Sequence, residues 1–331
     1  MREIRLRGSG IRTTVLGFGC AQLMRLPGRE DRQRLLAAAF DAGIRHFDTA
    51  RSYGLGVAER ELAALARGRR DALVIATKFG IRLHRGGSRL AGVQGVARRL
   101  IGWFPALRRL ARRSTAGLYQ PRRYDAESAR ESLETSLREL GTDYVDLFLL
   151  HEPSLADVRE TDVLPFLERA REEGKIRAWG VSGWPDDVVE ILESSSRLAP
   201  LIQVPNDPVR RTLDRLDSGG RSVVTFSPLS GQIGRLLLHL AAPSSRERWS
   251  ERLEFDLATD EAAASLLVRY CLEANRHGVV IFSTTRADRL APAISALRVD
   301  SAADRAAKRL PELFAAELPP PRSGRVAEQP L

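Results

Sequence analysis

Four ionisable side chains stand at or just beyond the ends of apolar runs in the first half of the chain. Asp48 ends the run IRHFD, Lys78 ends LVIATK and His151 ends DLFLLH, while Tyr53 follows Asp48 by five residues. A free phenol is a weak acid, but a neighbouring ammonium stabilises the phenolate and lowers the pKa, and a carboxylate can hold that ammonium in place. With an imidazole orienting the same oxygen, this set predicts protonation of a carbonyl as a hydride reaches its carbon.

Lys78 is the most informative of the four residues. The chain has three lysines against 49 arginines, so composition does not explain a lysine at the end of a buried run. The competing interpretation is a buried structural ion pair between Lys78 and Asp48, with His151 an ordinary histidine at a strand end. A metal site made of His46, Asp48 and His151 is a further alternative. An ammonium among these ligands would oppose a cation, so no metal is predicted.

The elements that must position these residues are short apolar runs alternating with stretches of helical period, as in a parallel sheet with crossover helices. Eight strands are predicted, at 14–19, 44–48, 73–78, 144–150, 177–181, 201–204, 222–226 and 279–283. Seven helices are predicted, at 31–42, 58–66, 126–140, 158–173, 185–194, 261–276 and 287–297. Eight such units over about 250 residues favour an α/β fold of the closed (β/α)8 barrel type, with functional groups at the carboxyl ends of the strands.

Composition sets wider bounds on the class of protein. With 43% hydrophobic and 28% charged residues the chain is globular, and two cysteines are too few for a disulfide scaffold. An apolar run of eighteen residues, as a membrane span needs, is absent from the sequence, and the first ten residues lack the apolar core of a signal peptide. We therefore expect a cytoplasmic protein with one barrel over residues 1–302 and a partly disordered tail over 303–331.

The net charge of +10 belongs to one segment. Residues 81–124 contain eleven arginines and neither Asp nor Glu, whereas the rest of the chain carries a net charge of −1. Within this segment, apolar residues recur at helical spacing over 93–111, with arginines beside and opposite them up to 113. We predict a basic helical insertion after the third strand, on the face that carries the four ionisable residues.

Three interpretations of residues 93–113 remain open: a helical lid over the barrel mouth, a docking surface for an acidic partner, and a contact with a membrane surface. Nucleic acid is the least favoured partner, because an apolar stripe has no role on a phosphate backbone.

Six stretches, read together, resemble the aldo-keto reductases in content, order and spacing. They are HFDTARSYG, VIATK, DLFLLHEP, GKIRAWGVSGW, FSPLSGQ and VVIFSTTRADRL. The resemblance implies a TIM barrel and an NAD(P)H-dependent oxidoreductase that reduces a small-molecule aldehyde or ketone. It assigns Asp48, Tyr53, Lys78 and His151 to the catalytic tetrad of the family, with Tyr53 as general acid. The alternative function is a non-catalytic barrel that binds the nicotinamide cofactor as a sensor or regulatory subunit.

The same resemblance assigns further positions to the cofactor. They are Ser182 and Gln203 at the nicotinamide carboxamide, Phe226 under the nicotinamide ring, Ser227 and Leu229 at the pyrophosphate, and Thr284 and Arg289 at the adenosine end. Arg286 joins Arg289 as a candidate phosphate ligand because of its charge. Gly183 and Ser283 depart from the usual residues of the family, Asn and in some members a phosphate-binding Lys, which weakens the case for tight NADPH selectivity. With Arg286 and Arg289 as the remaining candidate phosphate ligands, NADP(H) is favoured as cofactor and NAD(H) is the alternative.

Overall fold

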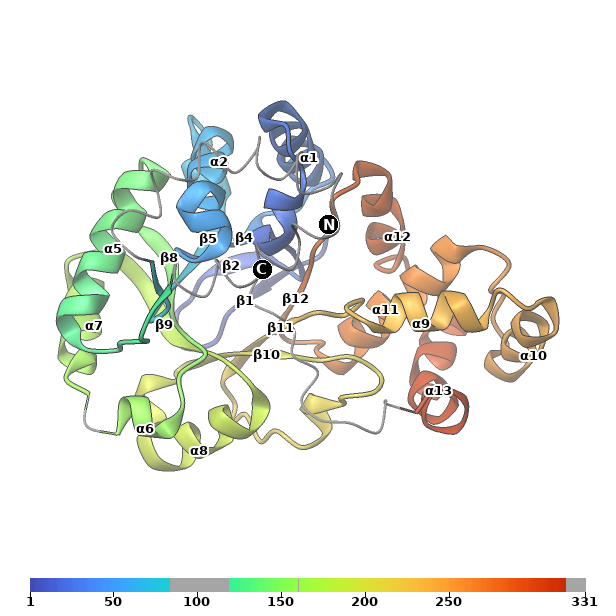
Figure 1. Cartoon of the computed structure of the whole chain (residues 1–331). Helices are drawn as coiled ribbons and strands as arrows, with labels where there is room; N and C mark the ends of the chain where they lie inside the picture. The colour runs from blue at the N-terminus through green and yellow to red at the C-terminus, as the bar shows by residue number, and fades with distance from the viewer. Residues whose placement is uncertain (84–118, 160, 320–331) are drawn as a thin grey trace, which may run out of the picture.

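The computed structural model describes residues 1–83, 119–159 and 161–319, and its centre is a closed barrel of eight parallel strands (Figure 1). The barrel strands are β3 (Leu16–Gly19), β4 (His46–Asp48), β5 (Val74–Phe79), β8 (Val145–His151), β9 (Ile176–Ser182), β10 (Leu201–Pro205), β11 (Ser222–Phe226) and β12 (Val279–Phe282). They follow chain order around the barrel, and β12 closes it against β3. The predicted (β/α)8 barrel and each of its eight strands are confirmed.

Helices surround the barrel (Figure 1). They are α1 (Arg29–Asp41), α2 (Val57–Ala66), α5 (Ala126–Leu140), α6 (Leu155–Val158), α7 (Val163–Glu172), α8 (Pro185–Ser195), α9 (Gln232–His239), α10 (Pro243–Leu253), α11 (Asp260–Ala274), α12 (Leu290–Ser295) and α13 (Ser301–Glu317). Short 3-10 helices include η1 (Cys20–Arg25) and η2 (Tyr53–Gly56). Among the described residues, none of the helices has both the length and the apolarity to cross a bilayer.

The strands are apolar on both faces because each face packs against a different cluster. Inside the barrel, residues such as Ala76, Leu147 and Val224 form one cluster, and outside it Phe47 and Phe148 pack against the surrounding helices. Burial on both faces explains why the strands read as continuous apolar runs. Most of these side chains are fully buried, so the barrel provides a rigid frame for the residues at the strand ends.

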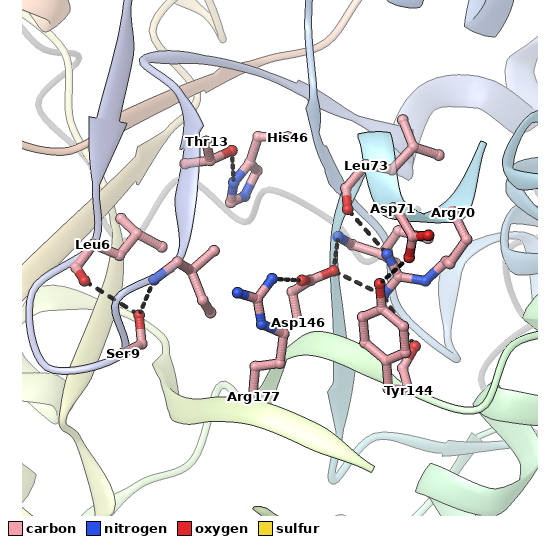
Figure 2. Close-up of polar contacts among 12 residues, drawn as sticks. Leu6, Ser9, Thr13, His46, Arg70, Asp71, Leu73, Tyr144, Asp146 and Arg177 are labelled. Carbon is pink, nitrogen blue, oxygen red and sulfur yellow. Dashed lines mark hydrogen bonds and ion pairs between the residues drawn. The ribbon is translucent and has the colours of Figure 1, made fainter. Parts of the chain in front are cut away.

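The amino-terminal hairpin closes one end of the barrel. Its strands β1 (Glu3–Arg5) and β2 (Arg12–Thr14) pair antiparallel, and Leu6 and Ile11 between them are fully buried in the interior cluster. Figure 2 shows this end, where the buried carboxylate of Asp146 accepts hydrogen bonds from Arg70 and Arg177 at 2.8 Å each. Since these contacts join the starts of neighbouring barrel strands, they stabilise this end of the barrel.

Two predicted boundaries differ from the structure. The helix predicted over 158–173 is divided into α6 and α7, because the Thr161 hydroxyl accepts a hydrogen bond from the Val163 amide and donates one to the Tyr124 carbonyl. The division predicted between residues 302 and 303 falls inside α13, which buries Leu310 and Phe314 in the main core cluster. The expected disorder at the carboxyl terminus concerns residues 320–331, which lie outside the described residues.

The ends of the predicted insertion form a small ribbon next to β5. Strand β6 (Arg82–Leu83) pairs antiparallel with β7 (Tyr119–Gln120), so the chain leaves β5 and returns to nearly the same place. The apolar stripe and the arginines predicted over 93–113 lie outside the described residues. The interpretations of that segment as lid, docking surface or membrane contact therefore stay predictions.

Candidate active site

The predicted acid–base residues meet at the carboxyl ends of β4 and β5. The Lys78 ammonium donates three hydrogen bonds, to Asp48 Oδ1 at 2.6 Å, to the Thr49 carbonyl at 3.0 Å and to the Tyr53 hydroxyl oxygen at 3.2 Å. An ammonium has three donors and no acceptor, so Lys78 is fully satisfied. Because the Tyr53 oxygen accepts from Lys78, the phenolic proton of Tyr53 is left free to point elsewhere.

Burial changes the acid–base balance that the sequence predicts. Lys78 is 2% and Asp48 5% exposed. Burial alone would lower the pKa of Lys78, but Asp48 and Tyr53 outweigh it and hold that pKa above its usual value. For Tyr53, burial raises the pKa and exceeds the opposite effect of Lys78. The predicted net lowering of the Tyr53 pKa is therefore wrong: the phenol stays protonated, with the ammonium in place to stabilise a phenolate.

His151 ends β8 and faces Tyr53. The two ring centroids are 5.8 Å apart and the planes meet at 83°, an edge-on arrangement. Burial holds the pKa of His151 well below its usual value, and the charges of Lys78 and Arg122 add to this effect. The imidazole is therefore neutral at pH 7, and hydrogen bonds from the described residues leave both of its ring nitrogens unoccupied. One nitrogen carries a proton and is free to donate to a ligand oxygen.

The turn that carries Tyr53 is locked by a buried network. Gly54 and Leu55 have φ of +57° and +58°, and a Cβ at Gly54 would meet Met24 at 2.1 Å. Behind this turn, Arg51 donates to the fully buried carboxylate of Glu59 at 2.9 Å. That carboxylate also accepts from Thr77 on β5 and from Ser136 on α5. Glu59 thus joins the Tyr53 turn to the strand of Lys78.

The residues predicted at the carboxamide lie beside the tetrad. Ser182 pairs with His151 on one side and with Gln203 on the other in the barrel register. Gln203 is 1% exposed and donates through Nε2 to Asp48 Oδ2 at 2.8 Å, whereas its Oε1 is buried without a partner among the described residues. An unsatisfied buried acceptor is costly, so Gln203 presents a place for an N–H donor.

The other predicted cofactor residues follow the ends of β11 and β12. Phe226 and Leu229 are half-buried, and between them Ser227 has a φ of +61°, which turns the chain sharply away from the strand. Thr284 is buried and caps its own turn by accepting from the Arg286 amide at 3.1 Å. Arg289 is exposed, as is Arg286.

Arg286 is already engaged within the protein. Its guanidinium forms a bidentate ion pair with Asp288, in which Nε donates to Oδ1 at 3.0 Å and Nη2 donates to Oδ2. Arg289 makes no ion pair with the described residues and is the freer of the two candidate phosphate ligands. The structure thus brings the four tetrad residues and Gln203 into contact and places the remaining predicted residues on the neighbouring strand ends.

Three contacts around the site were not predicted from the sequence. They are the Thr49 carbonyl under Lys78, the Tyr124 hydroxyl at the His151 carbonyl, and the Arg122 guanidinium at Glu152. A backbone acceptor leaves no signal in residue types. Tyr124 and Arg122 belong to the end of the basic segment, whose charge indicates contacts with partners and gives no signal of contacts with the barrel.

Comparison with known proteins gives one family. The aldo/keto reductase family model matches residues 15–310. Among curated relatives, D-threo-aldose 1-dehydrogenase of a Pseudomonas species is 31% identical over 193 residues, which is 55% of this chain and 53% of the relative. An aldo-keto reductase of Mycolicibacterium paratuberculosis is 28% identical over 227 residues, 67% of this chain and 63% of the relative. The chain thus spans between half and two thirds of the length of these relatives.

Solved structures show the same architecture. An aldo-keto reductase from Bacillus halodurans in its holo form superposes with a TM-score of 0.68 and 21% identity, covering 94% of this chain and 96% of the other. Glycerol dehydrogenase from Gluconobacter oxydans superposes with a TM-score of 0.70 and 17% identity, with 98% of both chains covered. At such identities the likeness establishes the fold, while the family model covers nearly the whole barrel. The chain therefore belongs to the aldo/keto reductase family.

Proposed function

We propose that this protein reduces an aldehyde or ketone to an alcohol with NADPH or NADH, and that Tyr53 is the general acid. One observation carries the proposal: the Lys78 ammonium donates to the Tyr53 oxygen, so the Tyr53 proton is available to the oxygen of a substrate. Membership of the family supports carbonyl reduction as the reaction class.

The raised pKa of Tyr53 suits this role. The phenol keeps its proton at neutral pH until the substrate oxygen becomes strongly basic, which happens only as the carbonyl carbon is reduced. The phenolate that then forms lies beside the buried ammonium of Lys78, held by Asp48. Because this charge is already in place and shielded from water, it stabilises the developing negative charge without reorganisation.

His151 supplies the second contact to the substrate oxygen. A neutral imidazole donates one hydrogen bond and adds no positive charge that would compete with Lys78. With the Tyr53 hydroxyl in the turn after β4 and the His151 imidazole at the end of β8 both donating to the substrate oxygen, the carbonyl would be held in one orientation. Such orientation is worth a large factor in rate.

The residues present fit a nicotinamide cofactor. The free Oε1 of Gln203 can accept from a carboxamide N–H, with Ser182 one strand away, and the half-buried Phe226 offers an apolar face for a ring. When bound, the cofactor supplies the hydride. Ser227 and Leu229 would hold the pyrophosphate, and Thr284, Arg286 and Arg289 the adenosine end. Arg289 favours NADPH, while the engagement of Arg286 by Asp288 limits that preference.

The test is loss of reduced-cofactor absorbance with a panel of aldehydes and ketones. We expect turnover with the wild type and a loss of at least about 100-fold in kcat for Tyr53→Phe, the range for a lost proton donor. Tyr144→Phe is the matched control, because it removes a tyrosine hydroxyl bonded to Asp71 at the opposite end of the barrel. Cofactor binding without turnover would favour the non-catalytic alternative, and equal turnover by Tyr53→Phe would refute Tyr53 as the general acid.

A further inference from the structure

The chain returning from the insertion crosses the end of β8. Directly after β7, residues 121–124 lead to α5, and Tyr124 is 3% exposed. Its hydroxyl donates to the main-chain carbonyl of His151 at 2.6 Å. Tyr124 therefore touches the backbone of a residue whose side chain faces the site.

This hydrogen bond replaces a strand partner that β5 does not provide. The pairing of β5 with β8 ends at Phe79 and Leu150, so His151 lies one residue beyond it. Past Phe79, Gly80 turns the chain away with a φ of +112°, and a Cβ there would lie 2.1 Å from the Tyr124 ring. Glycine thus leaves the space into which the Tyr124 ring fits. This ring lies edge-on to that of Phe79, with the two ring centroids 6.1 Å apart.

A second contact fixes the residue after His151. Glu152 has a left-handed backbone, with a φ of +55°, which is unfavourable for a side chain of this kind. Arg122 donates to the Glu152 carbonyl at 2.6 Å and to its carboxylate at 2.9 Å. The Glu152 amide donates to the Ser182 carbonyl at 2.6 Å. The corner formed by residues 151 and 152 is therefore held from the side of the insertion as well as from β9.

The returning chain is itself anchored on two sides. The Arg123 amide donates to the Gly80 carbonyl at 3.0 Å, and Thr161 donates to the Tyr124 carbonyl at 2.5 Å. The outgoing and returning ends of the insertion are thus joined to each other and to the loop before α7. A hydroxyl mounted on such a segment can hold His151 with little freedom of its own.

We propose that Tyr124 is a positioning residue for His151, with Arg122 in support, so that the end of the insertion sets the orientation of the imidazole toward the substrate oxygen. The inference rests on the proposed function. It makes the connection after β5 a structural part of the active site, whatever else the insertion contacts.

The test compares Tyr124→Phe with Tyr144→Phe, since each removes one tyrosine hydroxyl and keeps the ring. For Tyr124→Phe we expect kcat/KM for the carbonyl substrate to fall about tenfold, because a small displacement of an orienting group is costly to rate. The cofactor dissociation constant, from fluorescence titration, and the urea midpoint should stay near those of Tyr144→Phe. Arg122→Gln is expected to lower kcat/KM in the same direction.

A second measurement does not depend on turnover. The chain has five histidines, so ¹⁵N-histidine NMR resolves them individually, with His151 assigned from a His151→Gln variant. Tyr124→Phe should shift the imidazole signal of His151 and leave that of His277 in place.

An unshifted His151 signal, or a loss of kcat/KM that follows weakened cofactor binding or stability, would overturn the proposal. If the wild type turns over no carbonyl, the proposed function fails, and the NMR shift alone decides whether Tyr124 positions His151.

Discussion

Replacing Asp48 by asparagine isolates the charge that the whole site depends on. The substitution keeps the shape of the side chain but leaves the Lys78 ammonium, 2% exposed, with neutral acceptors alone. Removing one partner of a buried ion pair typically costs about 3–5 kcal/mol of unfolding free energy, because the remaining charge is desolvated without compensation. Asp48→Asn should lose stability in this range at pH 7.

Asparagine also disturbs Gln203. Asp48 presents an acceptor oxygen to Lys78 and another to Gln203 Nε2, whereas asparagine has one oxygen and one NH₂ group. If the oxygen faces Lys78, Gln203 must turn its amide over and use Oε1 as the acceptor. That oxygen would then be lost to the carboxamide of the cofactor, so cofactor affinity should fall together with stability.

The pH dependence gives the sign of the effect. In the wild type the pKa of Lys78 is raised on folding, so its contribution to stability is complete below the unfolded pKa of about 10.5 and is lost above it. In Asp48→Asn, burial acts without the carboxylate and puts the folded pKa of Lys78 below the unfolded value. The unfolded state then binds the proton more tightly, and stability rises with pH by up to about 1.4 kcal/mol per unit.

Urea denaturation between pH 7 and 10 measures this difference. The deficit of Asp48→Asn relative to the wild type should shrink as the pH rises. Asp214→Asn, in an exposed pair with Arg211, is the matched control and should cost at most about 1 kcal/mol at every pH. Adding Lys78→Met to Asp48→Asn should recover part of the loss. A deficit below about 1 kcal/mol, or one that does not change with pH, refutes the reasoning.

Three further predictions concern buried or shared charges elsewhere. Asp146→Asn should lower the unfolding free energy by roughly 3 kcal/mol, since the carboxylate accepts from Arg70, Arg177 and the Ile75 amide (Figure 2); unchanged urea midpoints would contradict this. Burial lowers the pKa of His46 to about 4, so at acidic pH the unfolded state binds a proton that the folded state does not. Between pH 6.5 and 4 the wild type should therefore lose roughly 3 kcal/mol more of its unfolding free energy than His46→Gln, measured by chemical denaturation. Glu317 accepts hydrogen bonds from Arg248, Trp249 and Arg252 on α10, and Arg248 and its neighbours lower the pKa of Glu317 to about 2. Glu317→Gln should therefore speed amide hydrogen exchange in α10 and leave that of α5 unchanged.

The barrel and the meeting of Asp48, Tyr53, Lys78 and His151 at its strand ends could be predicted because both leave strong local signals. Strands buried on two faces are continuous apolar runs, and an ionisable residue that ends such a run is conspicuous. Helices α9, α10 and α13 left weaker signals. Helix α10 is mostly polar and buries only Trp249 and Leu253, and three of its side chains donate to Glu317 at the end of α13, far along the chain. Such a contact has no local pattern.

The contacts that orient the tetrad were hidden for a different physical reason. Tyr124 acts on His151 through a main-chain carbonyl, and any residue type could have supplied that acceptor. Its placement depends on Gly80, whose missing side chain makes room for the ring, and on a chain reversal whose ends are joined by the pairing of β6 with β7 and by the Arg123 amide at the Gly80 carbonyl. Sequence patterns reveal which groups can do chemistry, because chemistry requires particular side chains. The angles at which those groups meet are set by backbone contacts, and for His151 that contact comes from Tyr124, at the end of a segment whose residue types indicate only its charge.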